Sequence, residues 1–385
     1  MAILSPELSE IDIIDDALQF NIQNVDVSII NGLRRTILSN IETLVFKGTN
    51  DSINIIKNST KFNNEYMKHR LMNIPIFNNE ALSNDKMKNN SIINNYMVEL
   101  NETNDTMEKR HITTEHFKIK NKKTGEYLPR SEVEKCFPRD PITGDFILFT
   151  ILYPNFNKKN ESNETIHFES NIDIGTPEEN SCWNIVHNVC YENFKDIDKI
   201  AEKMDKLPSE EKRDFELLDA QRYYVKDKFK MTIQSLGVFS NEEIIKTACK
   251  IIMHKLNKIQ QYITSNFKIV TKEEVLFNET NGTLTEEEQE YYKMQYCNLY
   301  KDEDFFVFEL KDDDYTIGKI IEKHFNKLYG NKLDYIGFKK DHPTKKEAYI
   351  YIKFKSQVND ENIYGDFNNL LIILNKIFET IETKF

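Results

Sequence analysis

The sequence predicts an α+β fold: two strand–helix modules that pair within one chain, the first interrupted by a mainly β inserted domain. Near the N-terminus an alternating apolar segment precedes a segment with helical spacing. The same pattern returns 288 residues later, and each copy is followed by a long helix with a continuous apolar face. Because an apolar helix face needs a partner, we expect the modules to form an intramolecular pseudo-dimer.

The first copy begins with residues 18–22, which alternate like a half-buried strand. Residues 26–41 follow, with apolar side chains three and four positions apart, so one face of the predicted helix is apolar. Either Asp26 or Ser28 is expected to cap this helix, because a short oxygen side chain accepts from the free N–H groups of the first turn. Arg34 and Arg35 lie beside the apolar face.

The second copy combines a predicted strand at residues 306–310 with a predicted helix at 317–328. A shift of 288 places Asp26 on Asp314 and Ser28 on Thr316, so the acidic turn and the hydroxyl residue coincide. The two copies and the final helix are expected to form the seam of the pseudo-dimer. The seam residues are Ile29, Leu33, Ile37, Ile41, Ile317, Ile321, Leu328, Leu370, Leu374 and Ile377.

Between the copies, the patterns alternate among short strands, helices and polar loops. Strands are expected at residues 92–100, 113–120, 146–153, 165–174 and 229–237. Helices are expected at 65–71, within 193–222 with a break at Pro208, and from a capping box at Ser240 to about residue 267. Residues 49–60, most of 78–106 and 175–183 read as loops.

After the second helix, residues 333–339 and 348–355 are expected to pair as strands, and a final helix closes the chain. The expected domain organisation follows from these elements. The first module comprises residues 1–47 and 220–267, the inserted β domain 48–193, a helical insertion 194–219, an acidic connector 268–300, and the second module 301–385.

Composition narrows the classes of function. The net charge is −12, whereas a protein that grips duplex DNA directly needs a basic surface for phosphate contacts. No apolar run is long enough to cross a membrane, and the N-terminal residues do not predict a secretory signal. The five scattered cysteines do not suggest a disulfide framework. We expect an intracellular protein with no membrane contact.

At the residues of the two strand–helix copies, the chain resembles the α-like assembly subunits of multisubunit DNA-directed RNA polymerases. The first half resembles the larger α-like subunit, called D in archaea, through Phe20-Asn-Ile and the Asp26-Val-Ser-Ile-Ile-Asn-Gly-Leu-Arg-Arg helix. The second half resembles the small partner, called L, through Phe306-Val-Phe-Glu-Leu, Asp314-Tyr-Thr-Ile-Gly and Asp341-His-Pro. Fusion of both halves resembles the single α-like subunit of large nucleocytoplasmic DNA virus polymerases.

The resemblance implies a scaffold without catalytic residues or cofactor, on which the two largest polymerase subunits assemble alongside other subunits. DNA contact would be indirect, no homodimer is expected, and the location would be the virion and the host cytoplasm, with the nucleus also open. Arg34 and Arg35 match a family contact with the second-largest subunit, and guanidinium groups suit a polar protein interface, although two arginines beside an apolar helix face could also be a solvated flank. Glu65, His69 and Arg70 match a second contact region, although Glu65 and His69 could equally form a local i, i+4 pair.

The sequence also leaves open a metal site and two functions other than polymerase assembly. Cys182, His187 and Cys190 come nearest to a metal cluster, but a structural zinc needs four ligands, and buried thiols are the competing interpretation. The acidic run 312–314 could serve a metal-dependent phosphoryl-transfer enzyme, or could simply be turn and N-cap residues before Thr316. A homodimeric scaffold unrelated to transcription is the third possibility.

Overall fold

The computed structural model describes residues 5–49, 51–77, 95–154, 163–265, 269–271, 297–311 and 313–385. The chain divides into two compact units. The larger unit contains residues 1–37, 188–234 and 241–385, and the smaller unit contains residues 38–187 and 235–240. Both mix helices with sheets, so the predicted α+β class is confirmed.

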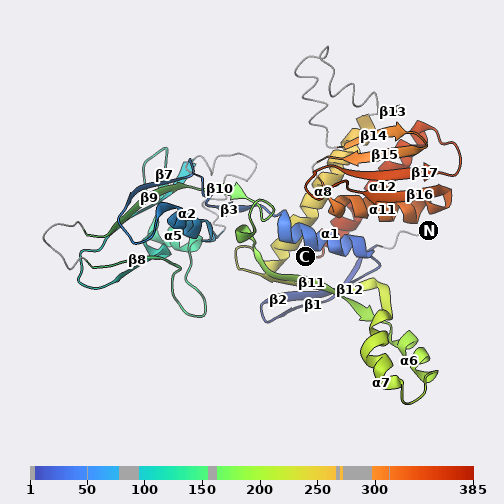
Figure 1. The fold of residues 1–385 in the computed structure, drawn as a ribbon, viewed down its shortest axis with the longest axis horizontal. Helices are drawn as coiled ribbons and strands as arrows, with labels where there is room; N and C mark the ends of the chain where they lie inside the picture. Colours follow the sequence, from blue (N-terminus) through green and yellow to red (C-terminus); the bar gives the residue numbers. More distant parts are fainter. Residues whose placement is uncertain are drawn as a thin grey trace, which may run out of the picture. The chain divides into compact units, whose positions relative to one another are not determined.

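The first sheet of the larger unit has the strand order β1-β2-β12-β11 (Figure 1). Its strands are β1 (Glu7–Ile14), β2 (Ala17–Gln23), β12 (Tyr224–Ser235) and β11 (Val186–Lys195). The central strand β2 runs antiparallel to both β1 and β12, and Phe20 and Ile22 are completely buried. Helix α1 (Val27–Ser39) begins four residues after β2 ends.

The second sheet of the larger unit has the order β13-β14-β15-β17-β16. Its strands are β13 (Val270–Thr271), β14 (Cys297–Asp302), β15 (Phe305–Leu310), β17 (Ala348–Phe354) and β16 (Leu333–Lys339). Strand β13 pairs parallel with β14, while the remaining neighbours are antiparallel. Helix α11 (Tyr315–Tyr329) follows β15 and continues into the 3₁₀ turn η5 (Gly330–Lys332).

The two sheets share one plan. In chain order, β1, β2 and α1 correspond to β14, β15 and α11, and each set is completed by a strand pair and a long helix. The sheet orders β1-β2-β12-β11 and β14-β15-β17-β16 match position by position. This is the arrangement of elements that the 288-residue repeat predicts.

The long helices α8 (Asn241–Ser265) and α12 (Asp360–Glu382) pack against each other along their lengths. Gln260 Nε2 donates to Asn368 Oδ1 at 3.0 Å, and Asn375 Nδ2 donates to Asn257 Oδ1 at 3.0 Å. These pairs run in opposite order along the two helices, so α8 and α12 are antiparallel. Their buried faces carry Leu256, Ile259, Leu370 and Leu374, in agreement with the predicted apolar stripes.

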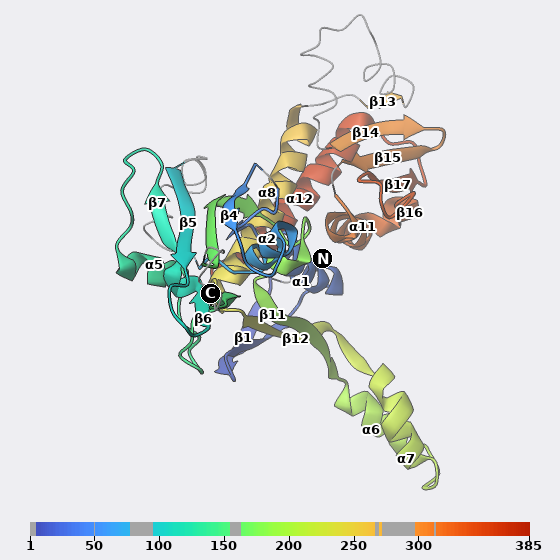
Figure 2. The ribbon, with the colours of Figure 1, turned by 60° about the vertical axis from the view of Figure 1, so that its left-hand side comes forward.

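A helical arm links β11 to β12 and extends beyond the ends of these strands (Figures 1 and 2). It consists of α6 (Ile197–Asp205), α7 (Lys212–Asp214), a π-helical turn η3 (Phe215–Asp219) and a 3₁₀ turn η4 (Ala220–Arg222). Pro208 lies between α6 and α7, so the predicted helix break is confirmed. Phe215 and Ala220 are the buried residues of the arm.

The smaller unit is built around mainly β structure, with a four-stranded sheet in the order β4-β9-β5-β7. The strands are β4 (Ile53–Asn58), β9 (Thr165–Asn171), β5 (Tyr96–Thr103) and β7 (Lys118–Asn121), with the two-stranded pairs β6 (Arg110–Thr113)–β8 (Leu148–Leu152) and β3 (Thr43–Val45)–β10 (Asp173–Gly175). The helices are α2 (Asn64–Met72) and α5 (Arg130–Cys136), with 3₁₀ turns η1 (Thr114–His116) and η2 (Ser181–Trp183).

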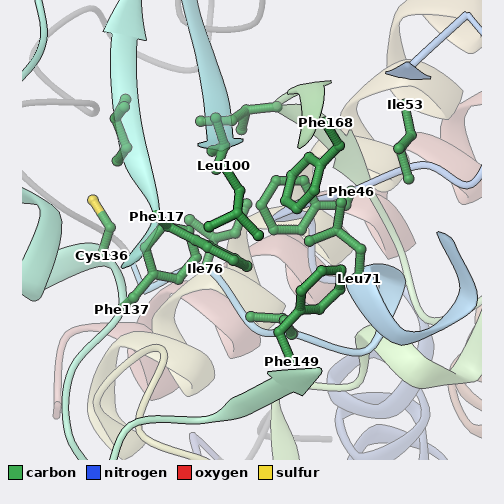
Figure 3. Packing of buried hydrophobic residues seen from close by; sticks show 14 of the residues in the cluster. Phe46, Ile53, Leu71, Ile76, Leu100, Phe117, Cys136, Phe137, Phe149 and Phe168 are labelled. Atoms are coloured by element: carbon green, nitrogen blue, oxygen red, sulfur yellow. The ribbon is translucent and has the colours of Figure 1, made fainter. Parts of the chain in front are cut away.

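Aromatic rings fill the core of the smaller unit (Figure 3). The Phe117 ring meets Phe137, Phe149 and Phe168 edge-on, with centroids 5.4 to 5.8 Å apart. Such edge-to-face contacts complement the ring quadrupoles. They hold the strands that carry Phe149 and Phe168 against Phe117 and Phe137, which follow η1 and α5.

Several local predictions were wrong. Residues 49–60 are not a loop, because Ile53–Asn58 pairs with β9 as strand β4. Residues 113–120 are not one strand, because a capping box between Thr113 and His116 starts the turn η1 between β6 and β7. Strand β1, at the edge of the first sheet, and strand β14, between β13 and β15 in the second, were not foreseen. Residues 78–94 of the predicted loop, and residues 268 and 272–296 of the acidic connector expected at 268–300, lie outside the described residues.

The expected domain boundaries remain predictions. The expected inserted domain, residues 48–193, and the observed smaller unit overlap over residues 48–187. Strand β14 (Cys297–Asp302) spans the boundary expected between residues 300 and 301.

Candidate functional site

Helices α1 and α11 approach each other closely at Gly32. A Cβ atom at this position would lie 2.8 Å from Ile320 Cδ1 and 3.8 Å from Thr316 Cγ2. The absence of a side chain therefore permits the contact, which is one of the uses of glycine in a helix. Gly32 and Ile320 are equivalent positions under the 288-residue shift, so the helices cross where the two copies of the repeat coincide.

The two helices begin with the same cap. Asp26 Oδ1 accepts from the Ser28 N–H at 2.8 Å, and Asp314 Oδ1 accepts from the Thr316 N–H at 2.8 Å. Of the two caps considered for α1, Asp26 is confirmed, because its carboxylate accepts the N–H of the first turn. The match at atomic level supports the alignment of the two copies.

Arg35 connects α1 to the cap of α11. Its Nε donates to Thr316 Oγ1 at 3.0 Å, and its Nη2 forms an ion pair with Asp314. Burial opposes ionisation of Asp314, but the Thr316 hydrogen bonds and the Arg35 charge outweigh it, so the pKa of Asp314 lies below its ordinary value. Arg35 thus has a role inside the chain that its position in the sequence did not reveal.

The other cap shows a related arrangement. Burial likewise opposes ionisation of Asp26, but hydrogen bonds from Ser28 and the charges of His324 and Lys327 on α11 lower its pKa. The buried His324 donates from Nδ1 to the Ile320 carbonyl at 2.8 Å, and burial holds the pKa of His324 below its ordinary value. Each cap carboxylate is therefore influenced by basic groups of the opposite helix.

Arg34, unlike Arg35, forms its hydrogen bonds within α1. Its Nε and Nη2 donate to Asn31 Oδ1 at 3.2 and 3.1 Å, within the same helix, and the residue is half-buried. The predicted partner-binding role of Arg34 and Arg35 stays a prediction. Arg34 fits it more simply, because Arg35 is already bound to Asp314.

Most of the predicted seam residues are buried. Eight are at most 8% exposed and belong to α1, α11 or α12: Ile29, Leu33, Ile37, Ile317, Ile321, Leu370, Leu374 and Ile377. Leu328 is only half-buried. Ile41 lies beyond the end of α1 at Ser39 and belongs to the smaller unit, so the helix is shorter than predicted.

Gly32 and Ile320 themselves were missed as seam residues. The signal that could have found them is the pairing of a glycine with a large side chain at equivalent positions of the repeat. An axis that relates the two copies brings equivalent positions together, and there is seldom room for two large side chains at such a crossing.

The second predicted contact region lies on α2 in the smaller unit. Glu65 and His69 are exposed and do not form the local ion pair considered for them. Arg70 donates from Nε to the Phe149 carbonyl at 2.7 Å and from Nη2 to the Leu148 carbonyl at 2.8 Å. Arg70 therefore attaches α2 to strand β8, while Glu65 and His69 remain candidates for contact with a partner.

The three candidate metal ligands, Cys182, His187 and Cys190, do not come together. The Cys182 thiol lies 3.8 Å from the Met72 carbonyl, and Cys190 Sγ accepts from Asn188 Nδ2 at 3.8 Å. His187 is exposed. Within the described ranges, no three His, Cys, Asp or Glu side chains come together in a group that could hold a metal ion.

The acidic run before α11 is engaged in structural contacts. Asp313 is buried and lies 3.3 Å from Lys255 Nζ, and Asp314 caps α11 and binds Arg35. Asp312 lies outside the described residues. This favours the turn-and-cap interpretation of the run over a metal site.

Among the described helices, none combines the length and hydropathy needed to cross a lipid bilayer. Residues 19–256 match the family model described as the RNA polymerase Rpb3/Rpb11 dimerisation domain. The chain is also similar to subunit 3 of the DNA-directed RNA polymerases II, IV and V of Arabidopsis thaliana, with 33% identity over 78 residues. That similarity covers 20% of this chain and 23% of the plant subunit.

Proposed function

Because the chain belongs to the RNA polymerase Rpb3/Rpb11 dimerisation domain family, we propose that it is a non-catalytic assembly subunit of a DNA-directed RNA polymerase. In this role it provides the platform on which the two largest, catalytic subunits associate. It works through packing surfaces and contributes no chemistry of its own.

The crossing of α1 and α11 at equivalent positions carries this proposal. A dimerisation domain buries apolar helices against a related copy, and here both sets of helices belong to one chain. The matching sheet orders, the equivalent Asp26 and Asp314 caps, and the antiparallel α8–α12 pair support the same interpretation. The chain then combines a larger and a small α-like subunit as an intramolecular pseudo-dimer.

The surfaces left for larger partners follow from what the pseudo-dimer already uses. Arg35 is occupied by Asp314, and Arg70 by the carbonyls of β8. Arg34, Glu65 and His69 keep donors or acceptors that a partner could engage. We assign these three residues to contacts with the large polymerase subunits.

The competing functions have less support. A homodimeric scaffold would need an apolar helix face left for a second copy, whereas α8 and α12 already cover each other. A phosphoryl-transfer enzyme would need the acidic run to bind a metal, whereas Asp313 and Asp314 are bound to Lys255 and Arg35. We therefore also propose that the isolated chain is monomeric, which sedimentation can measure.

Co-purification tests the assembly function. The tagged full chain should bring down the two largest polymerase subunits at one copy per complex. Arg34→Glu should reduce this association by reversing a charge at the interface, and Lys203→Glu on the exposed surface of α6 serves as the matched charge-reversal control. Circular dichroism establishes that both variants stay folded. Full association of the Arg34→Glu chain would contradict the assigned interface, and failure to recover either large subunit would contradict the function.

The origin and location of the protein are part of the same proposal. The fused arrangement and the Asn-, Lys- and Ile-rich composition favour a large nucleocytoplasmic DNA virus with an AT-rich genome. The protein would then be found in virions and in the host cytoplasm, which immunolabelling of infected cells and of purified particles can test.

A further inference from the structure

Strand β1 forms one edge of the first sheet, and no other strand of the described chain pairs with its outer side. The equivalent strand of the second sheet, β14, is not an edge. Strand β13 covers it in parallel register, with Val270 opposite Tyr300 and Thr271 opposite Lys301. The same position is thus filled in one sheet and open in the other.

The hairpin geometry shows which backbone groups face the open side. Strands β1 and β2 are joined by Asp15 and Asp16, both with positive φ (51° and 62°), as a two-residue type I′ turn requires. In such a hairpin the flanking pair, Ile14 and Ala17, is the hydrogen-bonded one. The next pair is therefore not hydrogen-bonded, so the N–H and C=O of Ile13 point away from β2.

The side chains of β1 combine exposed apolar groups with negative charge. Ile11, Ile13 and Ile14 are 43%, 68% and 50% exposed, respectively. Residues 7–16 contain only acidic ionisable side chains: Glu7, Glu10, Asp12, Asp15 and Asp16. Charges and bulges usually protect sheet edges, and β1 has an irregularity between Ser9 and Asp12. Protection alone does not account for three exposed isoleucines on the same strand.

We propose that β1 is a strand-addition site for an extended segment of another polypeptide in which Lys or Arg alternates with apolar residues. Its backbone would pair with the free groups of Ile13. Its apolar side chains would cover Ile11 and Ile13 on one face of the sheet, and its cations would meet Asp12 on the other face. A second copy of this chain does not fit, because two β1 strands side by side would bring ten carboxylates together. The proposal concerns the isolated chain and does not depend on the polymerase assignment.

A peptide of alternating Lys and Val, labelled with a fluorophore, tests the site on the full-length chain by fluorescence anisotropy. Ile13→Pro removes the outward N–H, while proline is tolerated at an edge position whose N–H faces solvent. Ile13→Val is the matched control, because it keeps the N–H and the β-branched side chain. We expect Ile13→Pro to weaken peptide binding at least tenfold and Ile13→Val to leave it nearly unchanged.

Two further measurements do not rely on the proline variant. Amide hydrogen exchange of the wild-type chain should show the Ile13 N–H slowed when the peptide is added. Asp12→Lys should weaken binding of the Lys/Val peptide. Equal binding of a Glu/Val peptide, an unprotected Ile13 amide, or no binding at about 1 mM peptide would overturn the proposal. Self-association of the chain that Ile13→Pro abolishes would show that the edge binds a second copy, and would also overturn it.

Discussion

Replacing Gly32 by alanine tests the crossing of α1 and α11 directly. The added Cβ would lie 2.8 Å from Ile320 Cδ1, closer than carbon atoms approach in a well-packed core. Ile320 is completely buried, so its side chain has little room to move away. Shortening that side chain with Ile320→Val removes the clashing atom. The nearest remaining neighbours are Ile320 Cγ1 at 3.6 Å and Thr316 Cγ2 at 3.8 Å, which are ordinary contacts.

The two effects of Gly32→Ala have opposite signs. Alanine favours a helix interior over glycine by about 1 kcal/mol. Overpacking a buried contact costs about 1–3 kcal/mol. We therefore expect Gly32→Ala alone to lower the free energy of unfolding by about 1 kcal/mol, and Ile320→Val alone to lower it by about 0.5–1.5 kcal/mol. The double variant should be at least as stable as Ile320→Val alone, because alanine at position 32 no longer meets the deleted atom. The loss of stability in the double variant should therefore be smaller than the sum of the two single losses by about 1–2 kcal/mol.

The chain offers separate probes for its two units. Cys249 and Cys297 are buried in the larger unit, so their labelling by a thiol reagent in increasing urea follows the opening of that unit. Trp183, the single tryptophan, belongs to the smaller unit and provides an internal control. The variants should shift the thiol transition and leave the tryptophan transition in place. Additive effects of the two substitutions would refute the close approach of Gly32 and Ile320.

Three other predictions follow from the same unit. Asp314→Ala should lower the free energy of unfolding by about 1 kcal/mol through loss of the cap, while Asp314→Asn, which keeps an acceptor, should cost less, as urea titration can measure. Burial holds the pKa of His324 below 6.5, so the unfolded chain binds a proton at this residue more readily than the folded chain does. The free energy of unfolding should therefore fall as the pH drops below about 6.5. Thermal melts between about pH 7 and 5 should show a smaller fall for His324→Gln. Burial raises the pKa of the Cys249 thiol, so the exposed Cys190 should be labelled long before Cys249 in the native protein, as mass spectrometry of labelled peptides would show.

Local signals predicted the elements with strong periodicity. The strand at 333–339 was predicted with its observed bounds, and the helices around Leu33 and Ile321 were predicted because apolar spacing and an acidic cap occur together in each. Strand β4 was missed because its polar side chains, among them Lys57 and Asn58, obscure the alternation of a strand with one covered face. Strand β1 was missed because acidic residues interrupt its apolar pattern.

The sequence by itself determined that two similar strand–helix copies exist in one chain, and that their helices carry apolar faces. Only the tertiary structure decided which residues of the two copies contact each other. The partner of Arg35, Asp314, lies 279 residues away in the sequence. Gly32 contacts Ile320, and their separation in the sequence equals the 288-residue shift of the repeat. Spacing and capping are local properties that a few neighbouring residues fix. Close approaches and long-range ion pairs depend on how whole elements pack, which no local pattern encodes.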